Sequence, residues 1–224
     1  MPRLTLARVA LGLAATGAAA TGVYFLALRP TVVNWGATAE EARRSLPGDE
    51  VVPSPKVQVT HAITIDAPPD AVWPWLAQIG CGRAGWYSYD LLDNAGIPSA
   101  RQILPEFQSI KVGDMIPMVP DGRLAIPVVA VEAGRSLVLG GAMDLATGQS
   151  ADLRDAPVRQ YFAGAWSFNL LPAGERSTRL LARGRMDWSP GPQTLPYYAL
   201  EPITFIMQRK MLLGIKERAE AGAR

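Results

Sequence analysis

The fold is constrained most strongly by an amphipathic strand that runs directly into a helix. In residues 57–65 the odd-numbered positions are apolar except for His61, and this period of two predicts a strand with one buried face. Pro68 and Pro69 then suit a first helical turn, where a missing N–H group costs nothing. Apolar residues at the first, fifth and eighth positions of 72–79 predict one face of a helix.

Turn signals divide the remainder of the chain into further elements. A short helix is expected at 89–95, with Ser88 as its N-cap and Gly96 as its stop, and a long helix with an apolar stripe is expected to begin near Pro202. Between them lie five strand-like runs, at 115–119, 124–132, 136–140, 163–171 and 178–188. This order predicts an α+β helix-grip fold, in which a curved antiparallel sheet wraps a long C-terminal helix around a cavity.

The last of these strands alternates arginines with small apolar residues. Arg179, Arg183 and Arg185 share one parity, and apolar residues hold the other. We expect the arginines to face water, on a sheet with one wet side.

The N-terminal part of the chain contains an uncharged run of 20 residues, 9–28, between Arg8 and Arg29. A helix of that length spans roughly 30 Å, the thickness of the hydrocarbon core of a bilayer. The run therefore predicts a single-pass membrane helix. A cleaved signal peptide, with a small-residue site at 18–20, and an ordinary buried helix are the alternatives. Arg3 and Arg8 favour an N-terminus inside the cell and a domain outside the cytoplasm.

The chain is accordingly divided into a membrane anchor at 1–29, a connector at 30–55 and a ligand-binding domain at 56–222. Within the connector, Thr38 and Glu41 have the spacing of a capping box, which predicts the start of a short helix.

Charge and composition exclude several classes of function. The net charge is +2, but residues 1–29 hold three arginines and no acid, so the remainder has 19 basic and 20 acidic side chains. A nucleic-acid-binding surface requires a strongly basic face, and we expect no nucleic-acid partner. Cys81 is the only cysteine and His61 the only histidine, which excludes the usual His/Cys zinc sites. We expect no metal and no cofactor.

Two segments resemble a known superfamily. IDAPPDAVWPWLAQIG (65–80) is similar to the opening of the START/Bet v 1-like proteins, the polyketide cyclase/dehydrase and lipid transport superfamily. GRAGWYSYDLLDN (82–94) and the pair NWGAT and LPGDE in the connector resemble a bacterial membrane-associated branch of it. The resemblance implies a helix-grip domain that binds a small hydrophobic or amphipathic molecule, lipid or polyketide-like, in an internal cavity.

Aromatic and methionine side chains are the candidates for the wall of that cavity, because they offer large and adaptable apolar surfaces. The candidate ligand-binding residues are Trp86, Tyr87, Tyr89, Met118, Trp166, Phe168, Met186 and Met207. Each of them also suits an ordinary packed core.

Two other functions remain open. The first is a cyclase- or dehydratase-like enzyme, as some members of the superfamily are, which would need an acid or base in the cavity. His61, Tyr87 and Asp187 are the candidate catalytic residues. The second is a tethered interaction module that acts through its surface and has a filled core.

Overall fold

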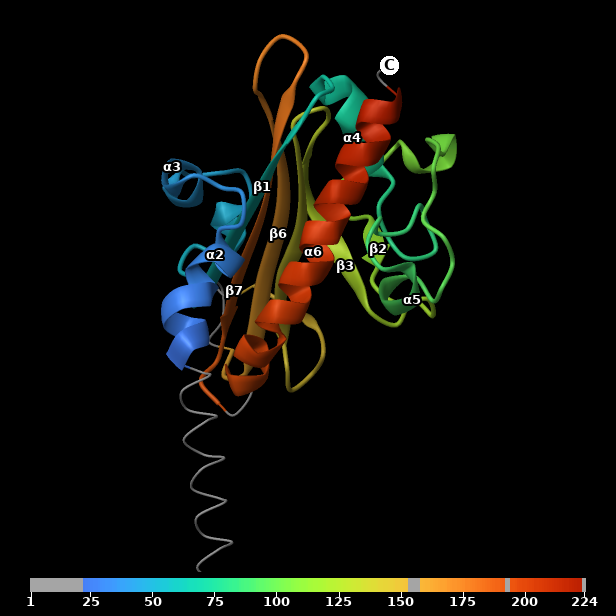
Figure 1. Ribbon diagram of the computed structural model, residues 1–224. Coiled ribbons are helices and arrows are strands. Elements are labelled where there is room, and N and C mark those ends of the chain that lie inside the picture. The colour runs from blue at the N-terminus through green and yellow to red at the C-terminus, as the bar shows by residue number, and fades with distance from the viewer. Residues whose placement is uncertain (1–21, 153–157, 192–193, 223–224) are drawn as a thin grey trace, which may run out of the picture.

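The computed structural model describes residues 22–152, 158–191 and 194–222, and its centre is a seven-stranded antiparallel sheet (Figure 1). The strand order is β1-β7-β6-β4-β3-β2, and β5 pairs with β4. The strands are β1 (Val57–Ile65), β2 (Met115–Pro117), β3 (Ala125–Glu132), β4 (Ser136–Asp144), β5 (Ser150–Ala151), β6 (Tyr161–Pro172) and β7 (Thr178–Trp188). The helical elements are η1 (Tyr24–Leu28), α2 (Arg29–Val33), α3 (Ala39–Arg43), η2 (Asp49–Val51), α4 (Pro69–Ala77), α5 (Asp90–Asp93), η3 (Pro105–Phe107) and α6 (Thr194–Gly222).

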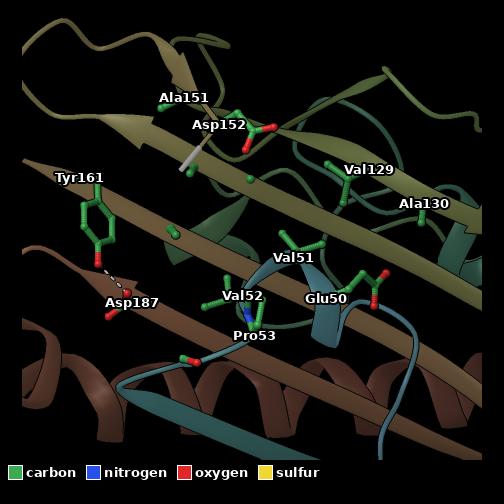
Figure 2. A pocket seen from close by; sticks show the side chains of 14 residues that line it. Glu50, Val51, Val52, Pro53, Val129, Ala130, Ala151, Asp152, Tyr161 and Asp187 are labelled. Carbon is green, nitrogen blue, oxygen red and sulfur yellow. Dashed lines mark hydrogen bonds between the residues drawn. The ribbon is translucent and has the colours of Figure 1, made fainter. Parts of the chain in front are cut away.

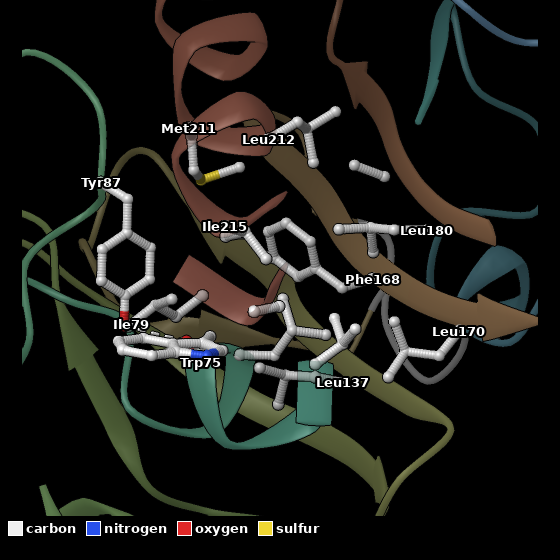
Figure 3. Close-up of a cluster of buried hydrophobic side chains, with 14 of the residues drawn as sticks. Trp75, Ile79, Tyr87, Leu137, Phe168, Leu170, Leu180, Met211, Leu212 and Ile215 are labelled. Carbon is white, nitrogen blue, oxygen red and sulfur yellow. Dashed lines mark hydrogen bonds between the residues drawn. The ribbon is translucent and has the colours of Figure 1, made fainter. Parts of the chain in front are cut away.

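The long helix α6 lies across one face of the sheet, which we call the inner face (Figure 1). Phe168 and Leu180 project from that face and meet Leu212 and Ile215 of α6, and all four are fully buried (Figure 3). The helix α4 closes one end of this core with Trp75. Each such large apolar side chain contributes about 1.5–3 kcal/mol by leaving water. The predicted α+β helix-grip architecture is therefore confirmed.

The backbones of β4 and β6 approach each other closely at a glycine in β4. Gly140 has a φ of +142°, and a Cβ built on it would lie 2.1 Å from the carbonyl oxygen of Gly164 on β6. Only glycine permits this approach of the two backbones. The predicted strand ended at residue 140, whereas β4 continues to Asp144 through this irregular point.

The connector wraps around the β1 edge of the sheet. The backbone N–H of Ala62 in β1 donates to the carbonyl of Trp35 at 3.0 Å, which covers part of an otherwise open strand edge. The connector then crosses to the face of the sheet opposite α6, which we call the outer face. There α3 begins with the predicted capping box. The hydroxyl of Thr38 accepts from the N–H of Glu41, and the Glu41 carboxylate accepts from the N–H of Thr38.

The expectation that the β7 arginines face water is wrong. The Arg183 side chain is 1% exposed and donates to Asp49, Thr60 and the carbonyls of Glu41, Ala42 and Arg44. Arg179 pairs with Glu41, and Arg185 donates to the carbonyl of Val52. The connector covers this face and supplies the acceptors, so the arginines hold the connector against the sheet.

Two predicted helix boundaries also differ. α6 begins at Thr194, and Pro202 lies inside it. Near this proline, which cannot donate a backbone hydrogen bond, the Thr204 hydroxyl donates to the carbonyl of Glu201 at 2.9 Å. Ser88 is not the N-cap of α5, because its hydroxyl donates instead to the carbonyl of Met207 on α6.

The predicted membrane segment is described only at its end. Residues 1–21, which include most of the run 9–28, lie outside the described residues, whereas 22–33 are helical. In the part of the chain that the structure describes, no helix has both the length and the apolar character needed to cross a bilayer.

Candidate functional site

A cavity of about 610 Å³ lies against the inner face of the sheet. Its lining residues include Met115, Leu124, Met143, Phe162, Trp166 and Met186. Small-molecule sites typically measure about 300–1,000 Å³ and are mostly apolar. Among the described lining residues there is no charged side chain, and Ser150 supplies the single hydroxyl. The cavity therefore suits an uncharged, mainly apolar guest.

The cavity occupies the half of the sheet where α6 begins. Phe162 in its wall pairs with Trp188 of β7, whose ring contacts Tyr198 of α6 at a centroid distance of 6.3 Å. The other half of the inner face is filled by the packed core of Figure 3. The inner face thus combines a solid core at one end with open space at the other.

Trp166 links these two halves. Its ring stacks on Trp86 at 5.4 Å with an interplanar angle of 22°, and contacts Phe168 at 4.9 Å. The Trp166 Nε1 atom is buried and has no hydrogen-bond partner among the described residues. A buried donor without an acceptor costs about 1–3 kcal/mol.

Gly184 marks further open space beside this wall. It pairs with Trp166 and stands two residues before Met186, so all three positions share the inner face. A Cβ built on Gly184 would meet no described atom within 4 Å, and its φ is not in the left-handed region. A side chain at this position would therefore project into space without straining the backbone.

The structure brings only two of the eight candidate ligand-binding residues, Trp166 and Met186, into the cavity wall. The others do not line this cavity. Trp86, Tyr87 and Phe168 are buried in the core, Met118 packs against that core, Met207 is half-buried on α6 and Tyr89 is 42% exposed.

Tyr87 has a structural position. Its φ is +56°, and its hydroxyl donates to the carbonyl of Trp75 at 3.1 Å while accepting from Gln78 at 3.0 Å. Burial raises the pKa of the Tyr87 phenol above its ordinary value, although Gln78 and nearby arginines oppose this. The backbone of α6 approaches so closely at Gly214 that a Cβ there would lie 2.3 Å from the Tyr87 carbonyl oxygen.

The three catalytic candidates do not meet. His61 lies on the inner face of β1, where its Nε2 is 2.7 Å from the carbonyl oxygen of Val32 and burial lowers its pKa. Tyr87 lies in the core beside α4. Asp187 lies on the outer face, where Lys56 and Tyr161 bind its carboxylate. Burial tends to raise the pKa of Asp187, but these two hydrogen bonds outweigh it and the pKa is lowered.

A second cavity, of about 560 Å³, lies on that outer face between the connector and the sheet (Figure 2). Val51 and Val52 of the connector form one wall, and the Tyr161 hydroxyl, 2.6 Å from Asp187, lies at one side. The carboxylate of Asp187 already accepts hydrogen bonds from Lys56 and Tyr161. It is therefore less available to bind a polar group of a guest in this cavity.

Some cavity residues were missed by the sequence analysis. Phe162 has the parity of Trp166 and Phe168, and this alternation could have identified it had the predicted strand begun two residues earlier. Met143 lies beyond residue 140, where the predicted strand ended, whereas β4 continues to Asp144.

No protein-family model matches the sequence, and no curated protein matches it either. Solved structures with a related arrangement include a protein from Mesorhizobium loti, with 14% identity, a TM-score of 0.41 and coverage of 74% of this chain and 98% of that one. A protein from Thermobifida fusca has 14% identity, a TM-score of 0.42 and coverages of 73% and 93%. A truncated norcoclaurine synthase from Thalictrum flavum has 12% identity, a TM-score of 0.36 and coverages of 72% and 91%. The assignment to the helix-grip class rests on the strand order of this chain and the position of α6.

Proposed function

We propose that this chain is a membrane-attached helix-grip protein that binds a small, uncharged, hydrophobic or amphipathic molecule in the inner-face cavity. The observation that carries the proposal is the apolar cavity of about 610 Å³, whose lining residue Trp166 has an indole N–H without a partner among the described residues. Apolar walls supply most of the affinity of such a site, and a few polar groups fix the orientation of the guest.

The residues that line the cavity indicate the chemical class of the guest. With no charged partner among the described lining residues, an ionised group would lose its hydration without compensation. An ester, ketone or ether oxygen, in contrast, would accept from Trp166 and leave the remainder of the guest in apolar contact. Membrane attachment is supported by the uncharged run 9–28, which leads into the described helical segment 22–33.

Replacing Trp166 with phenylalanine tests the polar part of this proposal. The change removes the N–H donor and keeps an aromatic ring. We expect Trp166→Phe to weaken binding of a fluorescent probe that carries a ketone by about two- to tenfold, because a lost hydrogen bond costs roughly 0.5–1.5 kcal/mol. A hydrocarbon probe of similar size should bind both proteins equally.

The comparison of the two probes separates recognition from packing. An equal loss for both probes would show that the indole contributes only its size. Failure of both probes to bind the unsubstituted protein would contradict the proposed function itself.

A further inference from the structure

The described end of the predicted membrane segment is fastened to α6. The Arg29 guanidinium makes two hydrogen bonds, each 2.8 Å, to the Glu201 carboxylate, and the Tyr24 hydroxyl donates to the same carboxylate at 2.8 Å. Glu201 is only 7% exposed, so this ion pair is largely removed from water. The rings of Phe25 and Tyr198 meet edge to face at 5.8 Å, and the Arg29 guanidinium lies over both.

These contacts join two exposed apolar surfaces. On the first half of α6, Leu200, Ile203 and Ile206 stand at helical spacing and are 51%, 53% and 51% exposed. The N-terminal segment, which contacts α6 at Tyr198 and Glu201 on another face of the helix, exposes Val23, Phe25, Leu26 and Leu28 at the same end of the domain. We call these seven residues the apolar collar. Large contiguous apolar surfaces on a protein mark contact with a membrane or another protein.

We propose that the apolar collar lies in the interface of a lipid bilayer, so that the cavity end of the domain rests on the membrane. The inference rests on the membrane attachment in the proposed function and adds the surface and the orientation. The bilayer is favoured because the N-terminal part of the collar belongs to the uncharged run 9–28, whose residues 9–21 precede the described chain.

The charges along α6 agree with this orientation. The exposed residues Arg209 and Lys210 follow the apolar stripe one turn beyond Ile206. They lie roughly 15 Å from Leu200 along the helix axis. Helices that lie in a membrane interface combine an apolar surface with such cations, which meet the lipid headgroups.

The collar also lies close to the cavity. Tyr198, which contacts Phe25, also contacts Trp188 at the end of β7, and Trp188 pairs with Phe162 in the cavity wall. The collar and the end of the sheet that holds the cavity are at the same end of the domain, opposite the β6–β7 hairpin (Figure 1). A guest dissolved in the bilayer would therefore have a short path to the site.

The test measures the depth of a fluorescent label on the full chain in vesicles. The native Cys81 is 2% exposed, so a polarity-sensitive dye reacts with a cysteine introduced at the surface. Ile203→Cys places the label on the collar, and Glu175→Cys, in the hairpin between β6 and β7, is the matched control. Each protein is reconstituted into phosphatidylcholine vesicles with or without brominated acyl chains. Flotation first reports whether the protein is attached.

We expect brominated lipid to reduce the fluorescence of the label at position 203 by about twofold or more, as for a group roughly 5–10 Å inside the interface. The label at position 175 should be unaffected. Protein that floats with both labels unquenched would overturn the orientation and leave the attachment intact. A label at 203 that is shielded from aqueous iodide but not quenched by brominated lipid would show that protein covers the collar, which also overturns the inference. Failure to float would contradict the attachment itself.

Discussion

Replacing Arg183 with alanine is expected to reduce the free energy of unfolding by about 3–5 kcal/mol, because it removes a buried donor from several largely buried acceptors at once. The guanidinium joins Asp49, 2.8 Å away, to three connector carbonyls, so the change also releases the connector from the outer face. Native domains are stable by only about 5–15 kcal/mol, and the loss would be a large share. Chemical denaturation with far-ultraviolet circular dichroism measures it.

Two further variants show whether geometry or charge is responsible. Arg183→Lys keeps the charge but cannot form the branched set of hydrogen bonds, and we expect most of the stability loss to remain. Arg135→Ala removes a surface arginine that is 74% exposed and pairs with Glu132, and it should leave the denaturation midpoint unchanged. Similar midpoints for Arg183→Ala and Arg135→Ala would show that Arg183 does not hold the connector.

Filling the space above Gly184 is expected to weaken probe binding strongly without unfolding the domain. A Cβ at this position meets no described atom within 4 Å, and glycine in a strand is roughly 0.5–1 kcal/mol less favourable than alanine. Gly184→Val should therefore keep or raise the stability while it fills part of the open space beside the cavity wall. Gly184→Phe should reduce the affinity for an apolar fluorescent probe by about a hundredfold, which corresponds to roughly 2.7 kcal/mol.

Gly184→Ala is the matched control, because it removes the conformational freedom of glycine and adds only one methyl group. We expect its probe affinity to stay close to that of the unsubstituted protein. A stability loss of about 1–3 kcal/mol for Gly184→Phe would indicate that the space is already filled, as in overpacked cores. Unchanged probe affinity in Gly184→Phe would place the binding site elsewhere.

The sequence predicted elements where a local pattern determines the structure. Alternation in 57–65 and the capping box at Thr38 and Glu41 involve neighbouring residues, and both are present in β1 and α3. The outer-face environment of Arg183 could not be predicted in this way. Its partner Asp49 is 134 positions away, and alternation gives the face of a strand but not what covers that face.

The residues of the site were harder to predict than the elements of the fold. Whether a side chain lines a cavity depends on the empty space beside it in the folded chain, and not on its residue type. Trp86 and Trp166 are chemically equivalent in the sequence, yet the first is packed in the core and the second lines the cavity. Their positions depend on the glycine-rich turn after α4 and on the register of β6 with β7. Gly184 has no side chain that could mark it as a candidate in the sequence. The open space beside it is found only from the three-dimensional positions of its neighbours.

The central claim, that the inner-face cavity holds an apolar guest, is tested most directly by native mass spectrometry of the full chain extracted in a mild detergent. We predict a bound species on the order of a few hundred daltons, the size of guest that such cavities accept, on the unsubstituted protein and on Gly184→Ala. The same species should be missing from folded Gly184→Phe. Only the mass of the bare chain in all three proteins, or an equal amount of bound species in all three, would contradict the claim.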